Sequence, residues 1–178
     1  WGAAMRRDGV AGVIVGFAKT EEARETALKL GFVDRVAESA ADVVEQADLV
    51  VICVPVGAME SVAREIGPRL KAGATVTDVG SVKQAVIDLV GPHLPKSVHF
   101  VPGHPLAGTE HSGPSAGFAD LFKNRWNILT PIEGRDDTAV ADLRKFWEEM
   151  GANVEIMTPD HHDLVLAVTS HAPHLIAY

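Results

Sequence analysis

A histidine flanked by glycine and proline stands in the middle of the segment FVPGHPLAGTEHSGP, residues 100–114. Pro105 restricts the residue before it to extended backbone angles, and Gly103 allows angles that other residues avoid. The ordinary pKa of histidine, about 6.5, suits an imidazole held in this way to accept a proton near neutral pH. The segment therefore predicts His104 as a catalytic base. The alternative is a histidine that only hydrogen-bonds its own loop.

Two further polar side chains follow His104 within the same turn-rich segment. Glu110 could orient an imidazole or hydrogen-bond a ligand, although a lone carboxylate on a loop is more often solvated. His111 is expected only to shape the loop. From the residues alone, both roles of Glu110 stay open.

Gly80 and Ser81 follow another β-rich run and precede a helical pattern. The surrounding sequence lacks the G-x-S-x-G elbow of a hydrolytic nucleophile. A hydroxyl and backbone N–H groups at the start of a helix instead suit a carboxylate or a cofactor amide. Lys83 would add positive charge there or be solvated.

More histidines lie near the end of the chain. His171 and His174 share one face of a helix at i, i+3 spacing, and Pro173 would bend or restart that helix. Metal sites need a third and a fourth ligand, and no cysteine partner or H-E-x-x-H motif is present. Ligand contact or packing is therefore predicted for this pair, and a metal site is not. The pair His161–His162 is predicted to cap the start of a helix on the surface.

Strands and helices alternate along the chain, as hydrophobic periodicity and capping signals indicate. The expected strands are residues 10–17, 33–36, 49–54, 75–78, 98–101, 126–130 and 153–157. The expected helices are residues 2–8, 21–30, 39–46, 59–70, 82–90, 137–150 and one capped by Asp160 that runs toward Ser170. This order predicts an α/β fold with a doubly wound, mostly parallel sheet, which takes its ligands at the carboxyl ends of the strands.

Three successive strand ends carry candidate residues: Val54 and Pro55, then Gly80 and Ser81, then Gly103–Pro105. Each has a purely structural explanation alone, since proline ends a strand, serine caps a helix and glycine turns a corner. Together, at one edge of one sheet, they indicate a ligand site.

The glycine-rich turn of a dinucleotide-binding fold, G-x-G-x-x-G, does not occur in the chain. The first segment is typical of the far end of a helix and the next of a strand, so the sequence is expected to begin after that turn. An acid at the end of the second strand would hydrogen-bond the ribose of NAD, but Ala18 and Lys19 stand there, with Arg24 further on. Lys19 could accommodate the 2′-phosphate of NADP or be neutral toward it, so NAD and NADP both stay open.

The chain of 178 residues carries a formal net charge of −8, with 47% hydrophobic and 22% charged residues. This balance, without a cluster of lysine or arginine, argues against nucleic acid or an anionic membrane as partner. No apolar run is long enough to span a bilayer, and no signal peptide is visible. Cys53, the single cysteine, lies in an apolar run and is predicted to be buried and inert, which suits a cytoplasmic protein.

Four segments resemble, in order, the prephenate/arogenate dehydrogenase family, also called cyclohexadienyl dehydrogenases: VTDVGSVK, FVPGHPLAGTEHSGP, WNILTP and HHDLVLAVTSHAPHLIAY. The resemblance implies oxidative decarboxylation of prephenate or L-arogenate to 4-hydroxyphenylpyruvate or tyrosine, with hydride transfer to NAD or NADP. It implies a catalytic role for His104 and substrate contacts from Ser81, Glu110, His171 and His174. The expected cofactor contacts are then the strand ends Val54, Pro55, Gly80 and Ser81, together with Lys19.

The resemblance also implies a division of the chain. Residues 1–158 would form a Rossmann-like NAD(P)-binding domain without its first strand and glycine-rich loop, and residues 159–178 would begin an α-helical domain. In the family that helical domain supplies dimer contacts and an arginine for the substrate carboxylate. A homodimer is therefore expected at full length, and little activity from residues 1–178 alone. The choice between prephenate and arogenate stays open.

Three other classes of protein fit parts of the sequence. A dehydrogenase of other small carboxylic acids, such as β-hydroxy acids, would share the sheet but not the G-H-P-x-A-G-T-E segment. A metal-dependent hydrolase would need His104, His171 and His174 to converge on an ion. A non-catalytic nucleotide-binding module would bind the cofactor without turnover.

Overall fold

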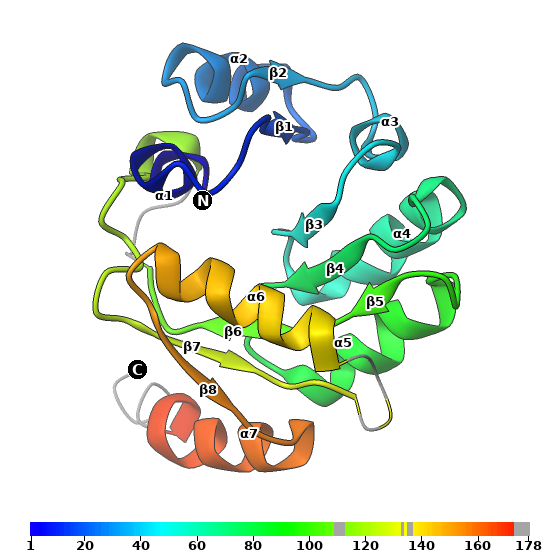
Figure 1. Ribbon diagram of the computed structural model, residues 1–178, viewed down its shortest axis with the longest axis vertical. Helices are drawn as coiled ribbons and strands as arrows, with labels where there is room; N and C mark the ends of the chain where they lie inside the picture. Colours follow the sequence, from blue (N-terminus) through cyan, green and yellow to red (C-terminus); the bar gives the residue numbers. More distant parts are fainter. Residues whose placement is uncertain (109–112, 133, 135–136, 173–178) are drawn as a thin grey trace.

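The computed structural model describes residues 1–108, 113–132, 134 and 137–172, with only the backbone of His171. Its strands are β1 Val15–Gly16, β2 Arg35–Val36, β3 Leu49–Ile52, β4 Thr75–Asp78, β5 His99–Phe100, β6 Gly103–Pro105, β7 Trp126–Leu129 and β8 Asn153–Ile156. Its helices are α1 Gly2–Asp8, α2 Glu21–Lys29, α3 Ala40–Val44, α4 Val56–Ile66, α5 Lys83–Val90, α6 Asp137–Glu149 and α7 Pro159–Leu166. Short 3-10 turns are η1 Gly67–Arg69, η2 Gly91–His93 and η3 Pro114–Ala116, and η4 Ala167–His171 is a π-helical turn (Figure 1).

The strands form three hydrogen-bonded ladders, of order β1-β2, β3-β4-β5 and β6-β7-β8. All pairs run parallel except β6 with β7, where His104 lies opposite Ile128. Parallel strands alternating with helices are the α/β architecture that the sequence predicts, and the fold class is confirmed. Residues 103–105, expected as a loop, form the antiparallel strand β6.

Two apolar clusters hold the helices on the strands. The first lies between β3–β5 and the helices α3, α4 and α5, and it encloses Met59, Ile66 and Phe100. The second lies beneath α6, where Trp147 is fully buried in the same cluster as Leu129. In Figure 1, α6 crosses in front of the strands, and α7 follows β8 at the lower edge of the view. The apolar run of β3 contributes Val50 and Ile52 to the first cluster.

Several element boundaries differ from the sequence-based expectation. α4 begins at Val56, earlier than expected. α7 is capped by the hydroxyl of Thr158, which accepts a backbone hydrogen bond in the place expected for Asp160. The strand expected over 10–17 forms only at Val15–Gly16. These differences move the ends of elements and leave their order unchanged.

Caps and burial agree with the local sequence at some positions and differ from it at others. Thr20 caps α2, and Gly9 ends α1 with a φ of 65°. Ser81 does not cap α5, which begins at Lys83 without a side-chain bond from its N-cap residue. The prediction of a buried Cys53 is wrong, because β3 ends before this residue and its side chain is exposed.

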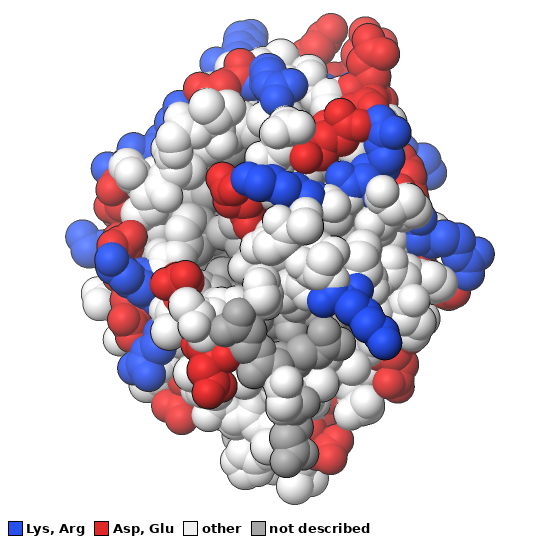
Figure 2. All heavy atoms as spheres, turned by 45° about the vertical axis from the view of Figure 1, so that its right-hand side comes forward, with Lys and Arg blue, Asp and Glu red and all other residues white. Residues whose placement is uncertain are grey.

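The surface carries charges of both signs. Acidic and basic side chains are interspersed over the face shown in Figure 2. Within the part of the chain that the structure describes, no helix combines the length and the apolarity needed to cross a membrane.

Candidate active site

A buried ion pair lies beneath the turn between β4 and α5. The carboxylate of Asp78, at the end of β4, is 2.5 Å from the ammonium of Lys83, and both side chains are fully buried. Burial raises the pKa of Asp78 and lowers the pKa of Lys83, while their mutual attraction opposes both shifts. The expectation that Lys83 adds charge at the cofactor or is solvated is therefore wrong, because its ammonium is buried and paired with Asp78.

The ion pair fixes the residue before His104. Asp78 accepts a hydrogen bond from the N–H of Gly103 at 3.1 Å, and Lys83 donates one to the carbonyl oxygen of Gly103 at 2.6 Å. Asp78 also accepts from the N–H of Gly80 at 2.7 Å. The same two side chains thus tie the turn after β4 to the strand that carries His104.

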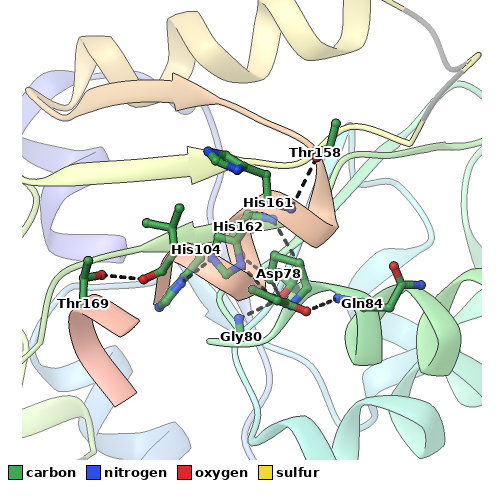
Figure 3. A network of polar contacts seen from close by, with 12 residues as sticks. Asp78, Gly80, Gln84, His104, Thr158, His161, His162 and Thr169 are labelled. Atoms are coloured by element: carbon green, nitrogen blue, oxygen red, sulfur yellow. Dashed lines mark hydrogen bonds and ion pairs between the residues drawn. The ribbon is translucent and has the colours of Figure 1, made fainter. Parts of the chain in front are cut away.

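His104 contacts a second histidine, which comes from α7 (Figure 3). Nδ1 of His104 is 2.9 Å from Nε2 of His162, and the side chain of His162 is fully buried. The prediction of a surface position is therefore wrong for His162, although His161 is exposed. His162 and Leu166, four residues apart, share the buried face of α7. That i, i+4 spacing was the signal in the sequence that could have identified His162.

A carboxylate supports His162 from the same helix. Oδ1 of Asp163 lies 2.8 Å from Nδ1 of His162. The carboxylate also accepts hydrogen bonds from the N–H groups of Lys83, at 2.7 Å, and of Gln84, at 3.0 Å (Figure 3). These are the first amides of α5, which have no partner within their own helix. Asp163 therefore joins His162 to the start of α5.

Burial and hydrogen bonding set the charges of this pair. Burial lowers the pKa of His162, against the opposing pull of the Asp163 carboxylate. Burial alone would raise the pKa of Asp163, but its hydrogen bonds from Lys83, Gln84 and His162 hold that pKa below the ordinary value. The arrangement favours a neutral His162 beside an ionised Asp163.

A cavity of about 520 Å³ opens beside His104. Its lining comes from β6, from the segment after it and from the end of α7 with η4: His104, Pro105, Leu106, Ala107, Gly108, Leu166, Thr169 and Ser170. The π-helical turn η4 forms part of the wall, and such turns are rare and occur frequently at functional sites. The volume is within the usual range of small-molecule sites, about 300–1,000 Å³.

The predicted cofactor contacts all lie just beyond the carboxyl ends of parallel strands. Lys19 follows β1, Val54 and Pro55 follow β3, and Gly80 and Ser81 follow β4. Lys19, Pro55 and Ser81 are exposed there, Val54 is half-buried and Gly80 is buried. β1 belongs to a different ladder from β3 and β4, and the carboxyl ends of parallel strands are where this architecture takes its ligands.

The other predicted substrate contacts fall outside the described residues. Glu110, with its neighbour His111, and His174 lie in segments that the structure does not describe, and the side chain of His171 is not described either. Their substrate contacts therefore stay predictions. Among the residues that are described, no group of three or more histidine, cysteine, aspartate or glutamate side chains could hold a metal ion.

Parallel strands alternating with helices, with glycine, serine and histidine beyond their carboxyl ends, define a Rossmann-like nucleotide-binding domain. Residues 1–156 match the family described as "Prephenate dehydrogenase, nucleotide-binding domain". The chain belongs to this family.

Individual relatives agree with the family match. The chain is 46% identical over 162 residues to a cyclohexadienyl dehydrogenase of Zymomonas mobilis, a match that covers 91% of this chain and 55% of that one. Prephenate dehydrogenase from A. aeolicus, in complex with hydroxyphenyl propionate and NAD+, has a TM-score of 0.91 at 36% identity, covering 99% of this chain and 61% of that one. Synechocystis arogenate dehydrogenase has a TM-score of 0.88 at 30% identity, covering 97% and 60%. The chain thus spans 55% to 61% of the length of these relatives.

Proposed function

We propose that this chain is the cofactor-binding part of an enzyme that oxidatively decarboxylates prephenate, L-arogenate or both, with hydride transfer to NAD+ or NADP+. The observation that carries the proposal is His104, which lines a cavity and is held at Nδ1 by a buried histidine. The relatives support the reaction class, since their names are those of cyclohexadienyl, prephenate and arogenate dehydrogenases. The products would be 4-hydroxyphenylpyruvate or tyrosine.

The residues beyond the strand ends fit a dinucleotide. Ser81 and Lys19 are exposed beyond the ends of β4 and β1, and the carboxyl ends of strands are where doubly wound sheets bind nucleotides. Gly80 leaves no room for a Cβ, which would lie 2.9 Å from Oδ2 of Asp78, so the backbone of this turn runs close to the sheet. NAD(P)+, when bound, supplies the hydride acceptor. The residues proposed to hold it are Val54, Pro55, Gly80, Ser81 and Lys19.

The reaction needs one base. As hydride leaves C4 of the cyclohexadienyl ring, the 4-hydroxyl must lose its proton, and we assign that proton to Nε2 of His104 because Nδ1 faces His162. When CO2 leaves C1, the electron pair of the broken bond enters the ring, and the C4 oxygen takes a proton back as a phenol. Aromatisation supplies the driving force, so the protein needs mainly to align and to move this proton. A positioned base contributes about 10²–10⁴-fold.

Further assignments belong to the same proposal. Ser81, Glu110, His171 and His174 would contact the substrate, as the family resemblance implies. Residues 1–158 would form the cofactor domain, and residues 159–178 would begin the helical domain of a cytoplasmic homodimer. The net charge of −8 and the mixed charges in Figure 2 support the absence of nucleic-acid and membrane partners.

The turn after β1 would decide between NAD and NADP. Arg24 donates a hydrogen bond to the carbonyl oxygen of Ala18 at 2.7 Å, and its guanidinium lies 5.7 Å from the centre of the Phe17 ring. An acid in this turn would bond the ribose of NAD and repel the 2′-phosphate of NADP. We expect Ala18→Asp to raise the ratio of kcat/KM for NAD over NADP by about 10-fold, or about 1.4 kcal/mol. An unchanged ratio, measured from initial rates with each cofactor, would show that this turn does not select.

To test the reaction, the chain is expressed together with its natural flanking sequence. Nicotinamide reduction is then measured with prephenate and with arogenate, each with NAD+ and with NADP+. We expect reduction with at least one pair, release of CO2 in equal amount, and a loss of about 10²–10⁴-fold in kcat for His104→Asn. The variant should keep its circular dichroism spectrum and its nucleotide affinity. If a folded protein gives no reduction with any pair, the reaction is wrong, and another dehydrogenase or a non-catalytic module takes its place.

A further inference from the structure

The contacts of His162 define a chain of hydrogen-bond donors and acceptors that ends at His104 (Figure 3). We propose that His162 and Asp163 are positioning residues that fix the tautomer of His104, so that Nε2 of His104 carries the lone pair that accepts the substrate proton. The kinetic part of this inference rests on the proposed function.

Two backbone amides set the direction of the chain. The N–H groups of Lys83 and Gln84 can only donate, and they donate to the two oxygens of Asp163, at 2.7 and 3.0 Å. The carboxylate is therefore the acceptor, and Nδ1 of His162, 2.8 Å from Oδ1, must carry a hydrogen. A neutral imidazole has hydrogen on only one ring nitrogen, so Nε2 of His162 is an acceptor.

That acceptor determines the hydrogen on His104. Nδ1 of His104 lies 2.9 Å from Nε2 of His162 and must donate to it. The hydrogen of neutral His104 is then on Nδ1, and the lone pair is on Nε2. When Nε2 takes a proton, the bond to His162 strengthens, because the donor becomes charged. A base oriented by a group behind it is the general arrangement of catalytic triads.

The inference requires a neutral His162. The ring is fully buried, and burial is the largest influence on its pKa and lowers it. Within the described part of the chain, the charged groups that face it are Asp163 on its own helix, Asp78 at the end of β4 and Lys83 on α5. Asp78 and Lys83 are 2.5 Å apart, so their opposite influences on His162 offset one another. Burial therefore prevails over the remaining pull of Asp163.

Asp163 is held in place by the helix that it caps. The N-cap residue of α5, Val82, makes no side-chain capping bond, and a carboxylate from α7 serves the first amides in its place. The N-terminus of a helix is the positive end of its dipole, which favours an ionised carboxylate. The hydrogen bonds of Asp163 to the first amides of α5 thus hold α7 against α5 and, through His162, orient His104.

Asp163→Ala tests the direction of the chain. Oδ1 of Asp163 accepts from both the N–H of Lys83 and Nδ1 of His162, so alanine removes the one acceptor that keeps the hydrogen of His162 on Nδ1. His162 can then carry its hydrogen on Nε2 and donate it to Nδ1 of His104. In that arrangement the hydrogen of His104 is on Nε2, the nitrogen that should accept the substrate proton. We expect kcat to fall by about 10–100-fold, with KM values within about twofold of the wild type.

Two substitutions of His162 separate hydrogen bonding from packing. His162→Gln retains an oxygen that can accept from His104, whereas His162→Leu fills the site without an acceptor. We expect His162→Leu to lose about 10–100-fold in kcat and His162→Gln to retain most of it. In the leucine variant the acid limb of kcat/KM should also move to lower pH, because protonated His104 loses its acceptor. His161→Gln, on the exposed side of the same helix, is the matched control and should equal the wild type.

The tautomer itself is read by ¹⁵N NMR of the imidazole rings, without substrate. We expect hydrogen on Nδ1 of His104 in the wild type and hydrogen distributed over both ring nitrogens in Asp163→Ala. The expected tautomers in a protein without turnover would contradict the proposed function and leave this inference standing. The inference is overturned if His104 carries its hydrogen on Nε2 in an active wild type. It is also overturned if His162→Leu and His161→Gln have equal kcat and equal pH profiles.

Discussion

The buried pair of Asp78 and Lys83 holds the backbone next to His104 in place. Burying the pair costs free energy, because two charges are removed from water. Such a pair gives little net stability by comparison with apolar residues of similar volume, because desolvation offsets the attraction. Its specific effect here is on the backbone, since the N–H and the carbonyl of Gly103 bond to opposite members of the pair. The residue before the proposed base is therefore held from both sides.

Removing one member of this pair should destabilise the fold strongly. Lys83→Met leaves the Asp78 carboxylate buried without its cation, and we expect the free energy of unfolding to fall by about 3–5 kcal/mol in a urea titration. Arg64→Met is the matched control, because it removes an exposed i, i+4 pair with Glu60. That change should cost less than about 1 kcal/mol. Equal losses in the two variants would contradict the role of the buried pair.

Acid should destabilise the fold through His162. The pKa of His162 in the folded state lies below its ordinary 6.5, so the unfolded chain binds this proton more readily. The stabilisation is fully present above pH 6.5 and is lost as the pH falls from there toward the folded-state pKa. Urea midpoints measured across this range should show a smaller pH dependence in His162→Gln. An identical dependence in the variant would exclude His162 as the source.

The sequence identifies His104 but not its support. Glycine and proline beside a histidine are a local signal, and His104 was predicted from them. His162 was predicted on the surface, and Lys83 either beside the ligand or in solvent, because a polar residue at a helix start is usually solvated. Their burial depends on contacts between parts of the chain that are distant in sequence: Lys83 Nζ contacts Gly103, and the contact between α5 and α7 joins residues 80 apart.

At the scale of elements, the order of strands and helices was predictable because each is a local pattern. The apolar run at residues 49–54 and the capping residue Thr20 are examples. Strand β6 was not predictable, because glycine and proline normally interrupt strands and its pairing depends on β7. The start of α5 shows the same limit, since its capping carboxylate comes from α7.

The turn between β4 and α5 should tolerate no side chain at Gly80. A Cβ there would lie 2.9 Å from Oδ2 of Asp78 and 3.0 Å from Cγ2 of Val86, so the buried carboxylate would have to move. We expect Gly80→Ala to lower the free energy of unfolding by about 1–3 kcal/mol. Gly57→Ala is the control, because its Cβ meets nothing within 4 Å on α4, and it should be neutral or stabilise by up to about 1 kcal/mol. A neutral Gly80→Ala in thermal unfolding would contradict the tight turn.

At the scale of the whole chain, the negative electrostatic potential of these 178 residues repels the proposed anionic ligands. Its net charge is −8, and prephenate, arogenate and the dinucleotides all carry negative charge. The two signs of charge are interspersed on the face in Figure 2, so attraction must come from local groups such as Lys19. Affinity for an anion then depends on near contacts working against a weak repulsion at longer range.

Salt should therefore assist the encounter with an anionic substrate. Raising the ionic strength from about 0.01 M to about 0.15 M shortens the Debye length from about 30 Å to about 8 Å and screens the repulsion of the whole chain first. We expect kcat/KM for the anionic substrate to rise over this range. Potassium chloride titrations at constant pH measure it, and a steep fall would instead indicate a positive field that steers the substrate.

The contact of Asp163 with the first amides of α5 also bears on how the molecule comes together. It joins residues 80 apart, so closing it costs more chain entropy than forming either helix. The amides of Lys83 and Gln84 have no acceptor within α5, and their protection from solvent depends on Asp163. Deuterium uptake at these two amides therefore reports each separation of α7 from α5. Measured without substrate, their exchange rate therefore reports how often Asp163 leaves α5 and His104 is no longer held through His162.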